Sequence, residues 1–152
     1  PEVVDLADCL NKMGAKIKGQ GTDTVVIRGV KTLEGCDFSV IPDRVETATY
    51  LAAVAMTGGS IKIKRTRPES VDSVLNKLRE AGAVIESGED WISLKMEKDR
   101  PKATSLSTGP YPSFPTDMQA QFIALNSIAR GTATVTENVF DNRFMHVQEI
   151  AR

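Results

Sequence analysis

A carboxylate that can take part in acid–base chemistry follows the most proline-rich stretch of the chain. Residues 109–115 (GPYPSFP) contain three prolines within seven positions, and Asp117 comes two residues later. Because proline presets φ, such a loop is stiff, and a helical pattern of apolar residues begins at Met118. The spacing therefore places Asp117 at the start of a helix, where the helix dipole favours an anion. A carboxylate held there can hydrogen-bond to a substrate hydroxyl or accept its proton.

The same residues also fit a purely structural interpretation. Thr116 and Gln119 have the T-x-x-Q spacing of a capping box, in which both side chains bind free amides at a helix start. Asp117 would then only complement the helix dipole. The apolar positions of this helix would be core residues, namely Met118, Phe122, Leu125 and Ile128. The physics of the residues alone favours this structural role.

A second segment with chemical potential is residues 136–146 (TENVFDNRFMH), which follows a β-rich run. Its mixture of charged and aromatic residues is typical of a functional surface loop. The alternative is an ordinary loop whose phenylalanines lie beneath it. His146 is the one histidine of the chain, and zinc needs three or four protein ligands. We therefore expect no metal site, and a structural or supporting role for His146.

The elements that must position these segments repeat along the chain. Residues 3–17 resemble residues 71–85 at an offset of 68, each with an amphipathic helical pattern, Gly-Ala and a short β-rich run. Glycine is typical of a helix C-terminus. Residues 47–64 resemble residues 118–136 at an offset of about 72, again as a helix, a glycine and a strand. Strands over 36–41 and 104–107 are expected before these helices.

The repeat predicts an α/β (α+β) fold made of β-α-β-α-β-β units. The chain would hold the end of one unit, a whole unit from about 36 to 95, and the first half of the next. The pattern breaks at Pro42, just before a helix, and the charged stretch 95–102 is expected to link two units. The chain starts with Pro1 and stops within a unit, so we expect a fragment of a longer protein.

Composition restricts the partners. Nineteen basic and twenty acidic residues give a formal net charge of −1, which argues against a nucleic-acid partner because nucleic-acid-binding domains are usually basic. The most apolar run, residues 50–56, is far shorter than the ~20 residues of a membrane helix, so no membrane association is expected. Two cysteines, Cys9 and Cys36, are too few for a disulfide framework and are expected to be structural thiols in a reducing compartment.

Six segments together resemble the family of UDP-N-acetylglucosamine enolpyruvyl transferases. They are 10–15 (LNKMGA), 42–47 (PDRVET), 78–83 (LREAGA), 89–92 (EDWI), 112–121 (PSFPTDMQAQ) and 137–147 (ENVFDNRFMHV). The resemblance covers the whole chain, and its last two segments are the most specific. It implies a protein of two similar domains, each an inside-out α/β barrel of three β-α-β-α-β-β units. Residues 1–42 would then end the catalytic-loop domain, and residues 43–152 would be the first half of the second domain.

The resemblance also implies an activity. The family transfers the enolpyruvyl group of phosphoenolpyruvate to the 3′-hydroxyl of UDP-N-acetylglucosamine, by addition and then elimination of phosphate and without a cofactor. This is the first committed step of peptidoglycan synthesis in the bacterial cytoplasm, and cell shape and division depend on it. By the family motifs, Asp117 is the proposed base and also binds the sugar nucleotide. Val139 contributes to the nucleotide site, and Arg143 faces the cleft.

Two other functions remain open from the sequence. One is an enolpyruvyl transferase of the same fold that acts on shikimate phosphate, although its arginine-rich motifs are not recognised here. The other is a binding or assembly module without chemistry. By the resemblance, the lysine and the loop cysteine of the phosphoenolpyruvate site precede this segment, and further arginines and an aspartate follow it. We therefore expect the segment alone to be inactive, since a phosphoryl group needs several convergent cations.

Overall fold

The computed structural model describes residues 1–97 and 99–152, and the chain divides into two compact units, Pro1–Ile41 and Pro42–Arg152. Part of the expected linker 95–102, namely Lys98, lies outside the described residues. The remainder of that stretch includes the end of a strand at Met96.

The first unit is one helix followed by a hairpin. Helix α1 (Glu2–Lys12) leads into strands β1 (Lys16–Lys18) and β2 (Val26–Arg28), which pair antiparallel. The strand expected over residues 36–41 is wrong, because this segment has no regular structure. Its backbone bonds to side chains of α1 where a neighbouring strand was expected. Lys12 Nζ donates to the carbonyl of Asp37, and the Ile41 amide donates to the Asp5 carboxylate (3.4 Å).

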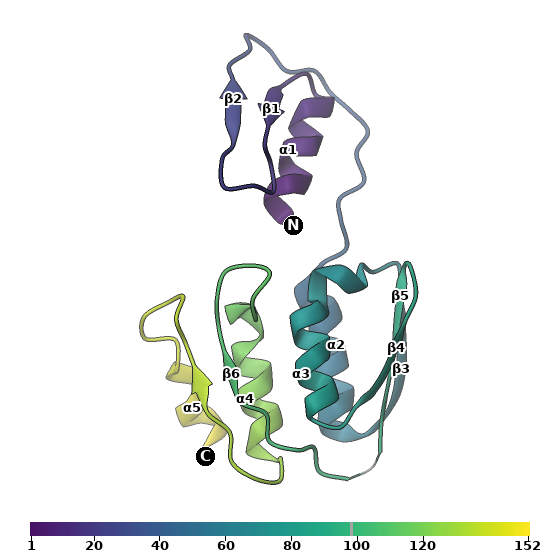
Figure 1. Cartoon of the computed structure of the whole chain (residues 1–152), viewed down its shortest axis with the longest axis vertical. Helices are drawn as coiled ribbons and strands as arrows, with labels where there is room; N and C mark the ends of the chain where they lie inside the picture. The colour runs from purple at the N-terminus through teal and green to yellow at the C-terminus, as the bar shows by residue number, and fades with distance from the viewer. Residues whose placement is uncertain (98) are drawn as a thin grey trace. The chain divides into compact units, whose positions relative to one another are not determined.

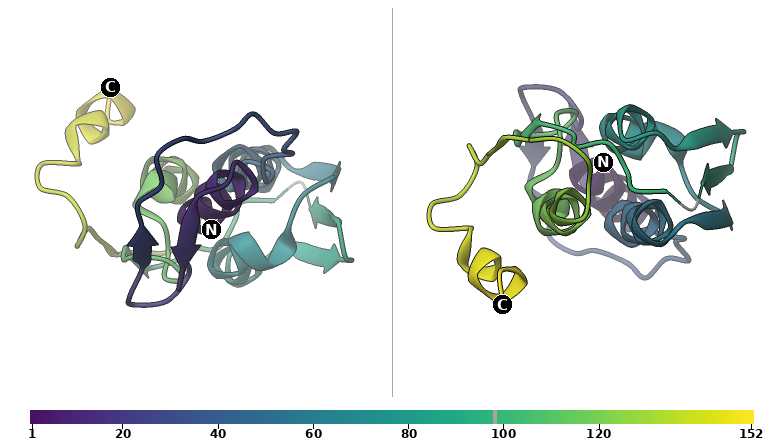
Figure 2. Two further views of the ribbon diagram at one scale, coloured as in Figure 1. Left: turned by 90° about the horizontal axis from the view of Figure 1, so that it is seen from above. Right: turned by 90° about the horizontal axis from the view of Figure 1, so that it is seen from below.

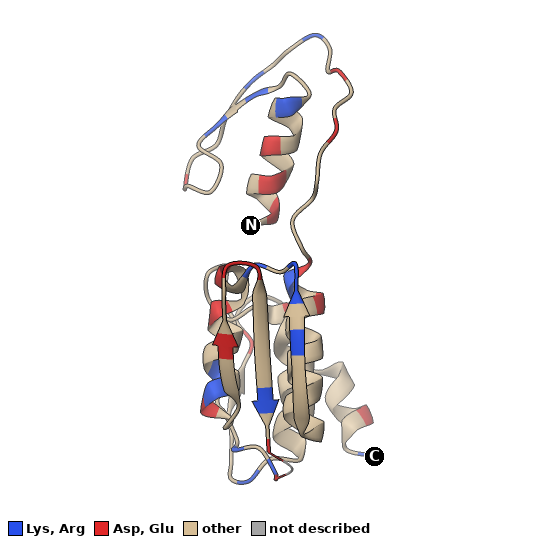
Figure 3. Cartoon of the chain, turned by 90° about the vertical axis from the view of Figure 1, so that its right-hand side faces the viewer, with Lys and Arg blue, Asp and Glu red and all other residues tan. Residues whose placement is uncertain are grey.

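The second unit is built on an antiparallel sheet with two helices on one face (Figure 1). Its strands run in the order β3 (Gly59–Lys64), β5 (Trp91–Met96) and β4 (Val84–Ser87). Helix α2 (Arg44–Thr57) is capped by Asp43, whose carboxylate accepts from the amides of Val45 and Glu46. Helix α3 (Asp72–Glu80) follows the short 3₁₀ helix η1 (Pro68–Val71). Basic and acidic residues are interspersed on the side of this unit that Figure 3 shows.

A third helix lies on the other side of α2 from the sheet (Figures 1 and 2). The short 3₁₀ helix η2 (Thr116–Met118) leads directly into α4 (Gln119–Ser127). The two-residue strands β6 (Leu106–Ser107) and β7 (Val135–Thr136) pair in parallel, and α5 (Met145–Ile150) follows. Helices thus form the centre and strands lie outside them. The core side chains include Leu51, Leu75, Leu78, Ile92, Leu94, Met118, Phe122 and Leu125.

The repeat is visible in individual hydrogen bonds. Both helices of the 68-residue repeat end in the same two backbone hydrogen bonds. In each, an alanine amide donates to the carbonyl of a leucine five residues earlier, and the preceding glycine amide donates to the carbonyl three residues before it. These pairs are Ala15 to Leu10 (2.9 Å) and Gly14 to Asn11 (3.0 Å), and Ala83 to Leu78 (3.0 Å) and Gly82 to Arg79 (3.0 Å). Both glycines have positive φ, +101° and +107°, which residues with a Cβ resist. The spacing of Gly-Ala therefore identified real helix ends.

Candidate functional site

Two loops leave the same edge of the parallel strand pair. Leu106 pairs with Val135 and Ser107 with Thr136, so β6 and β7 both end at this edge. The β6 end continues into residues 108–115, and the β7 end continues into residues 137–144. In α/β sheets, the carboxyl ends of parallel strands are where ligands commonly bind. The β-α-β connection through α4 therefore brings the two segments with chemical potential together.

The proline loop is fixed at its base by the core. Phe114 is buried and its ring meets Phe122 edge to face, with centroids 4.9 Å apart and planes at 82°. The Gly109 amide donates to the carbonyl of Phe114 (3.0 Å), which closes the loop. A Cβ at Gly109 would lie 3.0 Å from the Cβ of Ser113, a tight contact that would require Ser113 to shift by a few tenths of an ångström. Asp117 follows this anchored base within η2.

The expected capping box is wrong. Neither η2 nor α4 has a side-chain cap. Thr116 Oγ1 and Gln119 Nε2 instead donate to the same oxygen, Oε2 of Glu137, each at 2.9 Å. An ionised acceptor makes stronger hydrogen bonds than a neutral one. The T-x-x-Q pair therefore joins the start of α4 to the second loop.

Glu137 is a residue that the sequence interpretation missed. Within the described residues it accepts five hydrogen bonds, since Oε1 also receives Thr108 Oγ1 (2.9 Å) and the amides of Val139 (2.9 Å) and Phe140 (3.2 Å). Burial opposes its ionisation, but the bonds from Val139, Thr108, Thr116 and Phe140 outweigh burial and hold the pKa of Glu137 below its ordinary value. Glu137 is therefore an ionised junction between the two loops.

Asn138 adds a second junction beside the first. Its amide donates to Thr108 Oγ1 (2.9 Å), and its side-chain Nδ2 donates to Ser107 Oγ (2.7 Å) and to the carbonyl of Thr108 (3.1 Å). Thr108 is buried and bonds to both Glu137 and Asn138. The signal that could have pointed to Glu137 and Asn138 is their position directly after a strand, next to a second strand end. A single-sequence pattern did not show which side chains would meet there.

The structure brings two of the three expected site residues into contact. Arg143 NH2 donates to Asp117 Oδ1 at 3.0 Å, across the two loops. Asp117 is 51% exposed and Arg143 is 38% exposed, so both are accessible to a ligand. The Arg143 guanidinium also lies over the Phe140 ring, 5.0 Å from its centroid. Val139, the third expected residue, lies in the same loop as Arg143. Its side chain is exposed, and its amide donates a hydrogen bond to Glu137.

The phenylalanines of the second loop do not lie beneath it, because Phe140 is 55% and Phe144 is 41% exposed. Ile128, expected in the core, is 40% exposed, whereas the other three apolar residues of its set are fully buried. His146 is partly buried on α5, and its Nε2 has no hydrogen-bond partner among the described residues. The exposed aromatic residues leave an apolar surface next to the Asp117–Arg143 pair.

The surroundings of the Cys9 thiol do not favour a reactive thiolate. Burial, together with the neighbouring Cys36 thiol and the Asp5 carboxylate, raises the pKa of the Cys9 thiol. The Cys36 thiol points toward the carbonyl of Cys9 at 4.0 Å. Among the residues that the structure describes, no group of three His, Cys, Asp or Glu side chains is arranged for a metal ion. None of the helices described is long and apolar enough to cross a bilayer.

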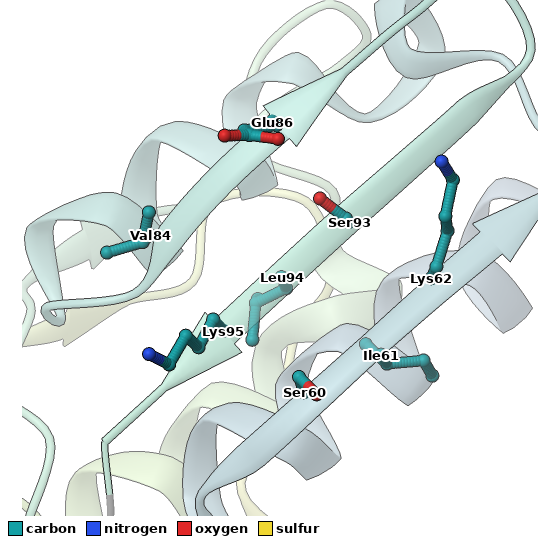
Figure 4. Close-up of a pocket in the computed structure, with 8 residues that line it drawn as sticks. All are labelled: Ser60, Ile61, Lys62, Val84, Glu86, Ser93, Leu94 and Lys95. Carbon is teal, nitrogen blue, oxygen red and sulfur yellow. The ribbon is translucent and has the colours of Figure 1, made fainter.

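A shallow pocket crosses the outer face of the three-stranded sheet (Figure 4). Strand alternation directs its polar side chains outward, including Lys62, Glu86, Ser93 and Lys95. Lys62 makes a cation–π contact with the Trp91 ring, with Nζ 3.8 Å from the ring centroid. We assign no chemistry to this pocket, because its residues follow from the solvent-facing period of the strands.

Comparisons with known proteins agree on one family. Residues 1–152 match the family described as EPSP synthase (3-phosphoshikimate 1-carboxyvinyltransferase). The chain is 59% identical, over its full length, to a UDP-N-acetylglucosamine 1-carboxyvinyltransferase of Shewanella halifaxensis (strain HAW-EB4), and spans 36% of that relative. The crystal structure of the enolpyruvyl transferase NikO from Streptomyces tendae superimposes with a TM-score of 0.78, covering 97% of this chain and 35% of NikO. At 23% identity this last likeness concerns the fold, and it confirms the expected fold class.

Proposed function

The chain belongs to the EPSP synthase family, and on that basis we propose that it is part of an enzyme that transfers enolpyruvyl from phosphoenolpyruvate to the 3′-hydroxyl of UDP-N-acetylglucosamine. The relative at 59% identity carries that activity in its name and supports this acceptor over shikimate phosphate. The structural observation that supports the proposal is the pairing of Asp117 with Arg143 at the loop edge. It places a carboxylate, a cation and the Val139 loop in one accessible region.

The pairing leaves Asp117 one free oxygen. Arg143 occupies Oδ1 from one side, and Oδ2 faces no partner among the described residues. In the proposed reaction, Oδ2 accepts the proton of the 3′-hydroxyl while the hydroxyl oxygen bonds to C2 of phosphoenolpyruvate and C3 takes up a proton from a general acid or water. The resulting tetrahedral adduct then loses inorganic phosphate from C2 and a proton from C3, which restores the enol double bond. Arg143 orients the carboxylate by holding its other oxygen.

The remaining expectations fit this proposal. Residues 1–42 would end the domain that carries the catalytic loop, and residues 43–152 would form the first half of the second domain. The two compact units meet at the Ile41–Pro42 peptide, one residue from this expected boundary. In the cell, the complete enzyme would supply the first committed intermediate of peptidoglycan synthesis in the cytoplasm. Cell shape and division would depend on it.

The proposal is tested by phosphate release from the complete enzyme encoded by the same gene. We expect release that needs both phosphoenolpyruvate and UDP-N-acetylglucosamine, and no release when shikimate 3-phosphate replaces the sugar nucleotide. Asp117→Asn should reduce kcat by at least about 100-fold, because an amide cannot accept the proton and general-base catalysis contributes about 10²–10⁴. If phosphoenolpyruvate releases phosphate with shikimate 3-phosphate but not with UDP-N-acetylglucosamine, the proposed acceptor is wrong and shikimate 3-phosphate is the acceptor.

A matched control exists on the same unit. Asp99 forms an exposed pair with Arg130 at 2.7 Å, like that of Asp117 with Arg143, but away from the two loops. Asp99→Asn should therefore leave turnover unchanged. If Asp117→Asn and Asp99→Asn have equal turnover and differ only in thermal stability, Asp117 has no role as a base.

A further inference from the structure

The contacts of Glu137 go beyond those of a surface loop residue. Its five donors come from three places, namely the end of β6 at Thr108, the start of α4 at Thr116 and Gln119, and its own loop at Val139 and Phe140. Apolar packing fixes the base of the proline loop at Phe114, but β6 and β7 are only two residues long each and add little backbone pairing. The relative position of the two loops therefore depends largely on directional hydrogen bonds, of which Glu137 accepts five and Asn138 and the Asp117–Arg143 pair supply the others.

We propose that Glu137 is a positioning residue that holds Asp117 and the Val139 loop in the relative position that the reaction requires. This inference rests on the proposed function. Oε2 holds Thr116, which directly precedes Asp117, and Oε1 holds the amides of Val139 and Phe140. Thr116 and the amides of the Val139 loop thus bond to different oxygens of one carboxylate. A displacement of about 1 Å at a reacting group can reduce a rate about 100-fold.

The chain offers an internal reason why a neutral isostere should succeed at this position. Gln119 is buried, and its Oε1 has no partner within the described residues, while its Nε2 binds Glu137. In Glu137→Gln, the new amide nitrogen can replace Oε2. If the Gln119 amide turns by 180°, its Oε1, which has no partner among the described residues of the wild type, can accept a hydrogen bond from the amide nitrogen of the new glutamine side chain. The Thr116 hydroxyl can also accept, so all five bonds can be kept without the charge.

This gives a test that separates positioning from direct catalysis. In the complete enzyme, we expect Glu137→Ala to reduce kcat about 10- to 100-fold and to raise KM for UDP-N-acetylglucosamine, while KM for phosphoenolpyruvate stays the same. Glu137→Gln should restore most of the activity. If Glu137→Gln is as inactive as Glu137→Ala, Glu137 acts through its charge and the positioning role is wrong.

The control variant for stability is Ile92→Val. Ile92 is fully buried in β5, away from both loops, and this change typically costs about 0.5–1.5 kcal/mol of stability. A loss of kcat in Glu137→Ala no larger than in Ile92→Val would overturn the inference.

A second measurement does not depend on the acceptor. Amide hydrogen exchange of the complete enzyme should show faster exchange in residues 137–144 of Glu137→Ala, with no change in β4 and β5. If the wild type releases no phosphate with these substrates, the proposed function fails while faster exchange still supports the positioning role. Unchanged exchange over 137–144 would reject that role whatever the substrate is.

Discussion

Replacement of Arg143 by alanine should affect turnover much more than stability. The pair that Arg143 forms with Asp117 is exposed on both sides, at 38% and 51%. Exposed ion pairs contribute about 0.2–1 kcal/mol, and an exposed cation over an aromatic ring, as with Phe140, contributes about 0.5–1 kcal/mol. Arg143→Ala should therefore cost at most about 2 kcal/mol, which is a decrease of a few degrees in Tm.

The expected effect on the reaction is larger. If Arg143 orients the base, its removal allows the carboxylate to move, and a misplacement of about 1 Å at a reacting group can reduce a rate about 100-fold. We therefore expect kcat/KM to decrease by about 10- to 100-fold. The assay is steady-state phosphate release by the complete enzyme over a range of UDP-N-acetylglucosamine concentrations, with thermal unfolding measured on the same samples.

Arg130→Ala is the matched control, because Arg130 forms the equivalent exposed pair with Asp99. It should lose a similar amount of ion-pair stability and keep its turnover. The orientation role of Arg143 is refuted if Arg143→Ala keeps the kcat/KM of Arg130→Ala. A decrease in Tm alone would then show that the pair only stabilises the loops.

Two other predictions concern acid stability and the activity of the segment. Because its bonds hold the folded-state pKa of Glu137 below the ordinary value, Glu137 should stabilise the protein above about pH 4.3. That contribution should disappear as the pH falls through the lower pKa, so the difference in Tm between wild type and Glu137→Gln should narrow there; a constant difference from pH 3 to pH 7 would contradict this. The 152-residue chain alone should release no phosphate from the two substrates, since phosphoryl transfer needs several convergent cations. Turnover by the isolated chain, abolished in Asp117→Asn, would disprove this expectation.

The helices could be predicted from the sequence because their signals are local. An apolar period of 3.6 and a following glycine lie within one stretch of chain, and α1 and α3 end as predicted. The strand over 36–41 failed because strand formation needs a partner that the β-rich pattern does not supply. Its amides and carbonyls instead found α1 side chains, such as that of Asp5.

The candidate site was only partly predictable. Asp117 stood out by its residue type, its proline loop and its helix start, whereas Val139 and Arg143 came from a family resemblance. The T-x-x-Q pattern predicted a capping box because a local rule considers only the nearest backbone amides. It could not include Glu137, which reaches Thr116 and Gln119 from another strand end, 21 and 18 residues away. Long-range acceptors of this kind are set by topology.

The arrangement explains why a charged group lies at a junction where apolar packing would be more common. Phe140 and the Asp117–Arg143 pair are exposed, so a core cannot hold this part of the two loops as it holds Phe114. An ionised carboxylate is the side chain best suited to accept several bonds from different directions, because it has two oxygens and about four lone-pair sites. Hydrogen bonds to a charged group are also stronger than neutral ones. The site therefore gains fixed geometry and accessibility together, and a change that removes the Glu137 acceptor should cost both loop order and catalysis.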